Sequence, residues 1–118
     1  MKYHNKKIVI DGIEFDSIKE GKRYQELKLL ERAGVIENLE LQKEFELQPS
    51  YKKNGKTIRK ISYLADFCYY ENGKYIVEDV KGMRNDVYKL KKKLFEYKYD
   101  FEIKETWYGK RIWWFIRY

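Results

Sequence analysis

Two aspartates and a lysine occupy positions where neighbouring strands of a sheet would bring them together. Asp66 and Asp79 flank an Asn72-Gly73 dipeptide, which is the strongest short-range signal for a tight hairpin turn. If this loop has two residues, Asp66 and Asp79 face each other, with their Cβ atoms about 4.5–5.5 Å apart. Lys81 stands two residues beyond Asp79, so its side chain points to the same face of the sheet.

Opposed carboxylates of this kind predict a site for a divalent cation. Like charges directly across a strand pair destabilise a purely structural sheet, whereas a cation between them converts the repulsion into coordination. Either aspartate alone would fit an ordinary solvated face, and a bulge in one strand would change the partners. Leu64, Cys68 and Val77 are expected on the same face, and their apolar character argues against a solvated one.

Glu20 is a further candidate carboxylate. A helix is expected to begin at Ser17, and Glu20 precedes Tyr24 by one turn, so it leans toward the buried side of that helix. An unpaired buried carboxylate is costly, which a metal site would explain. Ser17 to Glu20 also has the Ser-x-x-Glu form of a capping box, in which Glu20 bonds back to the first N–H group of the helix. The two roles can coexist.

The charge distribution agrees with a site of this kind. The net charge is +7, and the basic residues form two blocks around an acidic segment. Residues 52–60 carry five basic side chains and no acid, residues 61–80 are net negative, and residues 81–98 are again strongly basic. Basic side chains hold phosphates while carboxylates hold a cation, so the pattern indicates a metal-dependent enzyme that cleaves a polyanion. A generic basic surface is the alternative interpretation.

Length and composition exclude several classes of protein. The chain has 118 residues, which fits a single domain over residues 1–118, and 43% of them are hydrophobic, enough to build a core. No apolar run approaches the roughly 20 residues that span a bilayer, and the N-terminus lacks the apolar stretch of a secretory signal. With one cysteine, Cys68, and one histidine, we expect neither an internal disulfide nor a zinc finger, which suits a reducing cytoplasm.

Turn signals and apolar spacing predict the elements that position the candidate residues. A hairpin is expected over residues 8–15, and a helix over residues 17–33 that buries Tyr24, Leu27 and Leu30. Three runs separated by Asn54-Gly55 and Asn72-Gly73 then predict an antiparallel three-stranded meander. Its strands are expected at residues 44–53, 56–71 and 74–81.

The last part of the chain predicts a second helix and further strands. Asn85 or Asp86 is expected to cap a helix whose buried stripe is Val87, Leu90, Leu94 and Tyr97. Residues 101–107 and 111–117 are expected to pair as strands. Their aromatic residues, among them Trp107, Trp113 and Trp114, would pack in the core or at a subunit interface, with base stacking as the alternative. The expected class is therefore α+β, on a mixed or antiparallel sheet.

This order of elements and acidic residues resembles the PD-(D/E)xK nuclease superfamily. That superfamily has a restriction-endonuclease-like core, and its signature is matched here by Asp66 and by Asp79-Val80-Lys81, with Glu20 at the place of a first-helix carboxylate. Ala65 stands where the name of the superfamily has proline. A small phage-encoded family described as Holliday junction resolvase-like is more narrowly similar, at residues 15–27, Leu41-Gln42, residues 63–67 and residues 77–82.

The resemblance implies a Mg²⁺-dependent endodeoxyribonuclease that acts on branched DNA such as a four-way junction. Asp66, Asp79 and Glu20 would hold one or two Mg²⁺ ions, for which Mn²⁺ can substitute, and the main-chain carbonyl of Val80 would be a further ligand. The ion would polarise a phosphoryl oxygen and lower the pKa of a bound water. Lys81 would position that water and steady the phosphate, or else only form a salt bridge with Asp79.

The basic residues then become expected contacts to the DNA backbone, which favours recognition of shape over sequence. Two symmetric cuts at a junction imply a two-fold homodimer, and a phage-encoded protein would act in the bacterial cytoplasm. The alternatives are a general nuclease of duplex or single-stranded DNA and a non-catalytic DNA-binding accessory protein. The expected DNA contacts are Lys52, Lys53, Lys56, Arg59, Lys60, Arg84, Lys89, Lys92 and Lys93.

Overall fold

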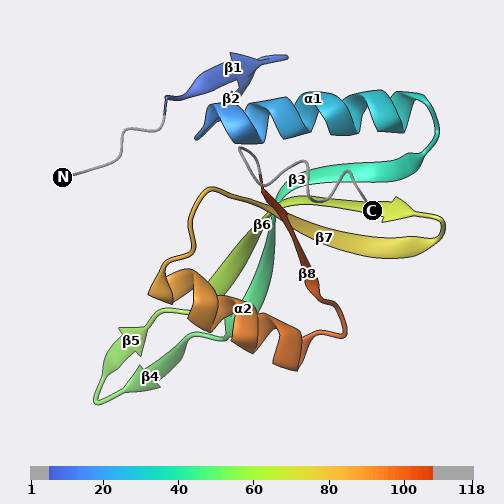
Figure 1. The fold of residues 1–118 in the computed structure, drawn as a ribbon. Coiled ribbons are helices and arrows are strands. Elements are labelled where there is room, and N and C mark those ends of the chain that lie inside the picture. The colour runs from blue at the N-terminus through green and yellow to red at the C-terminus, as the bar shows by residue number, and fades with distance from the viewer. Residues whose placement is uncertain (1–5, 108–118) are drawn as a thin grey trace.

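Four strands form the central sheet, in the order β3-β6-β7-β8 (Figure 1). The computed structural model describes residues 6–107. β3, β6 and β7 are antiparallel neighbours, whereas β8 lies parallel to β7. The sheet is therefore mixed, and the α+β class predicted from the sequence is confirmed. These strands are β3 (Ile36–Gln48), β6 (Ile61–Glu71), β7 (Lys74–Lys81) and β8 (Ile103–Trp107).

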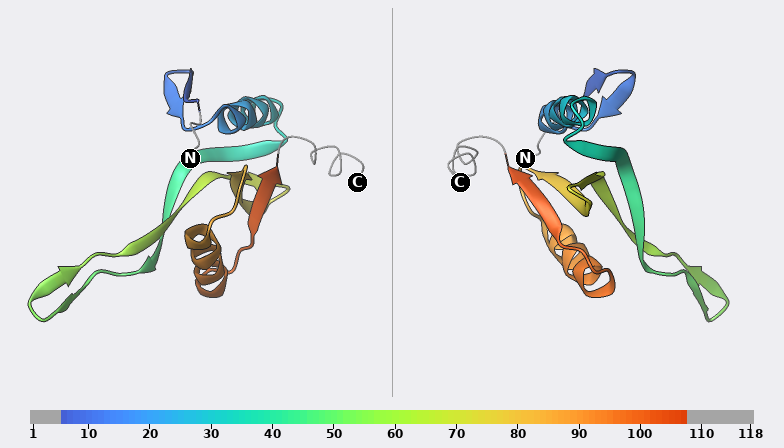
Figure 2. Two further views of the ribbon diagram at one scale, coloured as in Figure 1. Left: turned by 60° about the vertical axis from the view of Figure 1, so that its left-hand side comes forward. Right: turned by 90° about the vertical axis from the view of Figure 1, so that its right-hand side faces the viewer.

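The two helices cover opposite faces of this sheet (Figures 1 and 2). Helix α1 (Ile18–Arg32) buries Tyr24 and Leu27 in a cluster with the sheet residues Phe67 and Tyr69. Helix α2 (Asp86–Lys98) packs against the other face. Within residues 6–107, no helix is long and apolar enough to cross a membrane.

The N-terminal part of the fold follows the local signals in the sequence. β1 (Ile8–Ile10) and β2 (Ile13–Phe15) form the expected hairpin, and their turn residues Asp11 and Gly12 have φ values of 53° and 77°. Ser17 caps α1, because its hydroxyl accepts a hydrogen bond from the main-chain N–H of Glu20 at 3.1 Å.

The meander is confirmed, but its first strand begins earlier than expected. β3 starts at Ile36, and its first part carries positive φ values at Asn38 and Gln42, which hide the strand periodicity in the sequence. Beyond Pro49, which has no N–H for a ladder, β4 (Tyr51–Lys53) and β5 (Lys56–Ile58) continue as a separate hairpin (Figure 2).

The predicted buried stripe of α2 was wrong. Val87, Leu90, Leu94 and Tyr97 are exposed, Tyr97 to 91%, and Tyr88 and Phe95 face the sheet instead. Both sets have helical spacing, so spacing alone does not decide between them. The aromatic set is buried because Phe95 packs edge-on against Phe45 of β3, with ring centroids 5.0 Å apart.

The late strand expected at residues 101–107 is found as β8, which lies beside β7. Its expected partner at residues 111–117 lies outside the described residues, as do Trp113 and Trp114.

Candidate functional site

Asp66 and Asp79 meet where β6 and β7 separate. The ladder between these strands keeps the predicted register from Glu71↔Lys74 to Phe67↔Glu78, its last pair. Beyond it, Oδ2 of Asp66 accepts a hydrogen bond from the main-chain N–H of Val80 at 2.8 Å. Burial and the nearby carboxylate of Asp79 raise the pKa of Asp66 well above its usual range. The two carboxyl groups are therefore close neighbours, as the register predicts.

The alternation of side chains between the two faces of the sheet is interrupted in β6 at Asp66. The side chain of Asp66 therefore reaches the end of the ladder with β7. Tyr63 and Ala65 belong to the cluster under α2, whereas Phe67 belongs to the cluster under α1. Regular alternation would place these three residues on one face. Leu64 lines a pocket together with Asp66 and Asp79, as expected, but the residue is 54% exposed, so the expectation that it keeps solvent from this face was wrong.

Glu20 lies in the first turn of α1 and is buried. Its Oε2 accepts a hydrogen bond from Nε2 of Gln42 at 3.1 Å, so its carboxylate is directed across to β3. Burial and the negative charges of Asp16 and Asp79 raise the pKa of Glu20 to about 7. The Ser17 half of the capping box is present. The negative charges of Glu20 and Asp79 both help to raise the pKa of Asp66, so Glu20 lies close to the two aspartates.

Lys81 lies on the same face of β7 as Asp79, as predicted. Its Nζ is 3.1 Å from Oδ1 of Asp79 and 3.5 Å from the ring centroid of Tyr88. The hydroxyl of Tyr63 donates a hydrogen bond of 2.5 Å to Oδ2 of Asp79. Asp79 is thus held from both oxygens. The salt bridge that was the alternative role of Lys81 is present, and it places the ammonium group beside the carboxylate pair.

One pocket of about 700 Å³ brings these residues together between the start of α1, the middle of β6 and the end of β7. Carboxylate and carbonyl oxygens are the ligands that Mg²⁺ prefers, so the donor set fits this ion. Among residues 6–107, no three side chains of His, Cys, Asp or Glu type already form a metal-binding group. Its lining includes Glu20, Asp66, Asp79, Val80 and Lys81, and also Asp16 and Lys19.

A second pocket of about 730 Å³ shares Asp66, Asp79 and Lys81 with the first. It extends from the carboxylates to the base of the β4–β5 hairpin and to α2. Together the two pockets form a groove. Asp66 and Asp79 lie where the pockets join, and one wall of the groove is basic. That wall consists of Arg59, Lys60 and Lys91, with Tyr63 and Tyr88 beside them.

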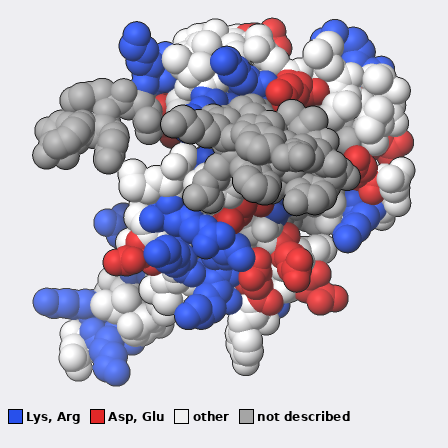
Figure 3. Space-filling model, viewed as in Figure 1, with Lys and Arg blue, Asp and Glu red and all other residues white. Residues whose placement is uncertain are grey.

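Of the expected DNA contacts, Arg59 and Lys60 line this groove, and Lys60 also pairs with Glu44 at 3.0 Å. Figure 3 shows lysine and arginine side chains gathered over α2 and over the β4–β5 hairpin. Lys52, Lys53 and Lys56 are exposed on the hairpin, and Lys89 and Lys93 on α2. Arg84 pairs with Glu105, and Lys92 pairs with Glu96 at 3.0 Å.

Several residues at the site were not named as site residues by the sequence analysis, among them Gln42, Tyr63, Tyr88 and Lys91. Gln42 lies within a motif of the resemblance, but its contact with Glu20 depends on a left-handed φ of 55°. The spacing of Tyr88 was a usable signal, since with Phe95 it forms a second helical stripe on α2. Tyr63 also lies within a motif of the resemblance, at residues 63–67, and Lys91 lies in the basic segment of residues 81–98, but neither was named as a site residue.

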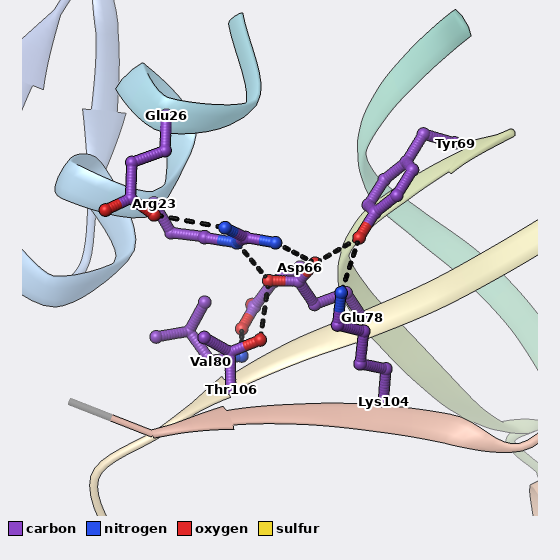
Figure 4. A network of polar contacts seen from close by, with 8 residues as sticks. All are labelled: Arg23, Glu26, Asp66, Tyr69, Glu78, Val80, Lys104 and Thr106. Carbon is purple, nitrogen blue, oxygen red and sulfur yellow. Dashed lines mark hydrogen bonds and ion pairs between the residues drawn. The ribbon is translucent and has the colours of Figure 1, made fainter. Parts of the chain in front are cut away.

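Glu78, the neighbour of Asp79, has a different role on the opposite face of β7 (Figure 4). It is fully buried and accepts hydrogen bonds from Arg23 of α1 at 2.6 and 3.0 Å. The hydroxyls of Tyr69 and Thr106 donate to it as well. Burial would raise the pKa of Glu78, but these partners hold it below its usual value. The network fixes α1, and with it Glu20, against β7 and β8.

The metal-free protein is expected to lose stability as the pH rises from about 4.5 to about 7. Glu20 has its pKa raised from 4.5 to about 7 in the folded state. In that window the folded chain keeps a proton that the unfolded chain has lost, so the free energy of unfolding falls by about 1.4 kcal/mol per pH unit for this group. Asp66 contributes with the same sign. Urea denaturation in EDTA at several pH values measures the slope.

Glu20→Gln is the matched variant for that measurement. It removes the titrating group while keeping an amide of the same shape beside Gln42, so the slope between pH 4.5 and 7 is expected to flatten. Glu31, Glu44 and Glu105 have lowered pKa values and therefore titrate below this window. An unchanged slope in Glu20→Gln would contradict the placement of a buried carboxylate at this position.

A family model described as "Protein of unknown function (DUF1064)" matches residues 1–114 of the chain. No curated protein matches the chain, and no solved structure does.

Proposed function

The chain belongs to the DUF1064 family, and we propose that it is a Mg²⁺-dependent endodeoxyribonuclease that hydrolyses phosphodiester bonds in branched DNA. One observation carries the proposal: Glu20, Asp66, Asp79, Val80 and Lys81 line a single pocket. That pocket opens into a groove with basic residues on its wall. The order helix, meander, helix, strand around a mixed sheet supports a restriction-endonuclease-like core.

In the proposed reaction each residue has a defined task. Asp66, Asp79 and Glu20, with the main-chain carbonyl of Val80, would hold the metal ion. Bound Mg²⁺ supplies Lewis-acid polarisation of the phosphoryl oxygen and a bound water of lowered pKa. Lys81 orients the attacking water and stabilises negative charge on the phosphate. Its position against Asp79 and the ring of Tyr88 keeps the ammonium group at the pocket wall.

A synthetic four-way junction incubated with the protein and Mg²⁺ tests this function. Paired cuts on opposite strands near the crossover are the expected result, and they imply a homodimer with two active sites. Scattered cuts on branched and linear DNA alike would indicate a general nuclease instead. Binding without cuts would indicate a non-catalytic accessory protein.

Arg59→Ala is expected to weaken DNA binding to the same extent for junctions of different sequence, because Arg59 lies on the groove wall and would contact phosphates. With six to eight phosphate contacts, the slope of log K against log salt should be on the order of −5 to −7, and the variant should reduce its magnitude by about 1. Fluorescence anisotropy at several salt concentrations measures both quantities.

Lys74→Ala is the matched control, since Lys74 is exposed at the Asn72-Gly73 turn, at the opposite end of β7 from Lys81. It should bind like the unchanged protein. A loss in Arg59→Ala that depends on the base sequence would contradict recognition by shape.

A further inference from the structure

The β4–β5 hairpin projects from the body of the protein as an arm of its own (Figure 2). All residues of its two strands are exposed. Among them are two large apolar side chains, Tyr51 at 47% and Ile58 at 36% exposure. A two-stranded hairpin gains little stability by itself, and these side chains add no buried core to it. These two apolar side chains are therefore available for contact with a binding partner.

The register of the arm gathers these side chains on one face. Tyr51 is directly opposite Ile58, and Lys53 is directly opposite Lys56 next to the turn. Alternate residues of a strand share a face, so the two pairs lie on the same side of the hairpin. Lys52 and Thr57, which also oppose each other, lie on the other side.

The positive charge of the arm indicates that the partner is a polyanion. Residues 51–61 contain no acidic residue. The arm reaches the candidate metal site through the residues that follow β5. Arg59 and Lys60 come directly after it, and with Leu64 they line the groove that contains Asp66 and Asp79. The basic residues of this segment are Lys52, Lys53, Lys56, Arg59 and Lys60.

We propose that Tyr51 and Ile58 form a wedge that enters the centre of branched DNA and unstacks the bases beside the branch point. Lys53 and Lys56, which lie next to the turn on the same face, contact the phosphates beside the branch point. This inference rests on the proposed function and deepens it, because it gives a physical reason for the choice of substrate. Inserting apolar side chains into a continuous duplex costs stacking energy. At a branch point the stack is already interrupted, so the same insertion costs less there.

The test uses junctions with 2-aminopurine, whose fluorescence rises on unstacking, at the branch point or within one arm. The full-length protein is bound in EDTA so that no cleavage occurs. Saturating protein is expected to raise the fluorescence several-fold at the branch point and not within the arm. Tyr51→Ala/Ile58→Ala should lose most of this rise, and its preference for junction over duplex should fall at least tenfold.

The matched control is Lys52→Ala/Thr57→Ala, which changes the other face of the same arm. It is expected to bind more weakly but to give the full rise at saturation. Melting temperatures will show that both variants are folded, since all four residues are exposed. An unchanged rise in Tyr51→Ala/Ile58→Ala, or an equal rise within the duplex arm, would overturn the wedge.

The proposed wedge and the proposed nuclease activity can be contradicted independently of each other. Paired cuts in Mg²⁺ without any rise at the branch point would overturn the wedge and leave the proposed function standing. A rise that depends on Tyr51 and Ile58, with no cuts in Mg²⁺, would support the wedge and overturn the nuclease function.

Discussion

Asp79→Asn is expected to slow cleavage of a four-way junction about a thousandfold or more, while the affinity for the junction stays close to that of the unchanged protein. Asp79 is the carboxylate that contacts both Lys81 and Tyr63, and its charge acts on Asp66 and Glu20. Metal coordination supplies several kcal/mol of transition-state stabilisation, and each 1.4 kcal/mol is about tenfold in rate. Single-turnover cleavage in Mg²⁺ and anisotropy binding in EDTA measure the two quantities.

Asp100→Asn serves as the control for this experiment. It is the same chemical change at an exposed position, in the loop between α2 and β8. This variant should cleave at the rate of the unchanged protein. Full activity in Asp79→Asn would mean that the reaction uses a different site.

Glu78→Ala is expected to lower the free energy of unfolding by about 3–5 kcal/mol, because it removes the buried partner of Arg23 and leaves this guanidinium only its contact with the half-exposed Glu26 at 3.0 Å. The Arg23 side chain is only 14% exposed and forms its bidentate contact with Glu78. Tyr69 and Thr106 lose their acceptor at the same time. Urea denaturation measures the change, and Glu78→Gln provides a milder variant of the same shape if Glu78→Ala does not fold.

A double-mutant cycle makes this second prediction specific. Arg23→Ala/Glu78→Ala should be destabilised by clearly less than the sum of the single changes, because the two side chains contact each other. Additive effects, or a loss below about 1 kcal/mol in Glu78→Ala, would contradict a stabilising network at this place. Glu78 and Asp79 are adjacent in sequence, so the two predictions separate a structural carboxylate from a functional one.

The part of the site that the sequence predicts correctly depends on local turn chemistry. Asn72 and Gly73 have φ values of 54° and 75°, which these two residue types adopt readily, so the turn fixes the register of β6 and β7. That register places Asp79 beside Asp66 and Lys81 on the same face. Ser17 and Asn85 likewise cap the two helices through their side chains, as predicted.

The parts that could not be predicted depend on contacts between distant residues. The change of faces in β6 at Asp66 accompanies a hydrogen bond that its carboxylate accepts from the main-chain N–H of Val80. No local sequence pattern predicts this bond. The orientation of α2 depends on which of two helical stripes fits the sheet, and Tyr88 and Phe95 fit because β3, β7 and β8 provide their partners. The contact between Gln42 and Glu20 needs an irregular strand.

Titration calorimetry with Mn²⁺ shows whether the carboxylate pair binds a metal ion at all. One or two ions are expected to bind to the full-length protein without DNA, and Asp66→Asn/Asp79→Asn should lose this binding while Asp100→Asn keeps it. Equal Mn²⁺ binding by Asp66→Asn/Asp79→Asn, or no binding by the unchanged protein at millimolar Mn²⁺, would contradict a metal site at Asp66 and Asp79.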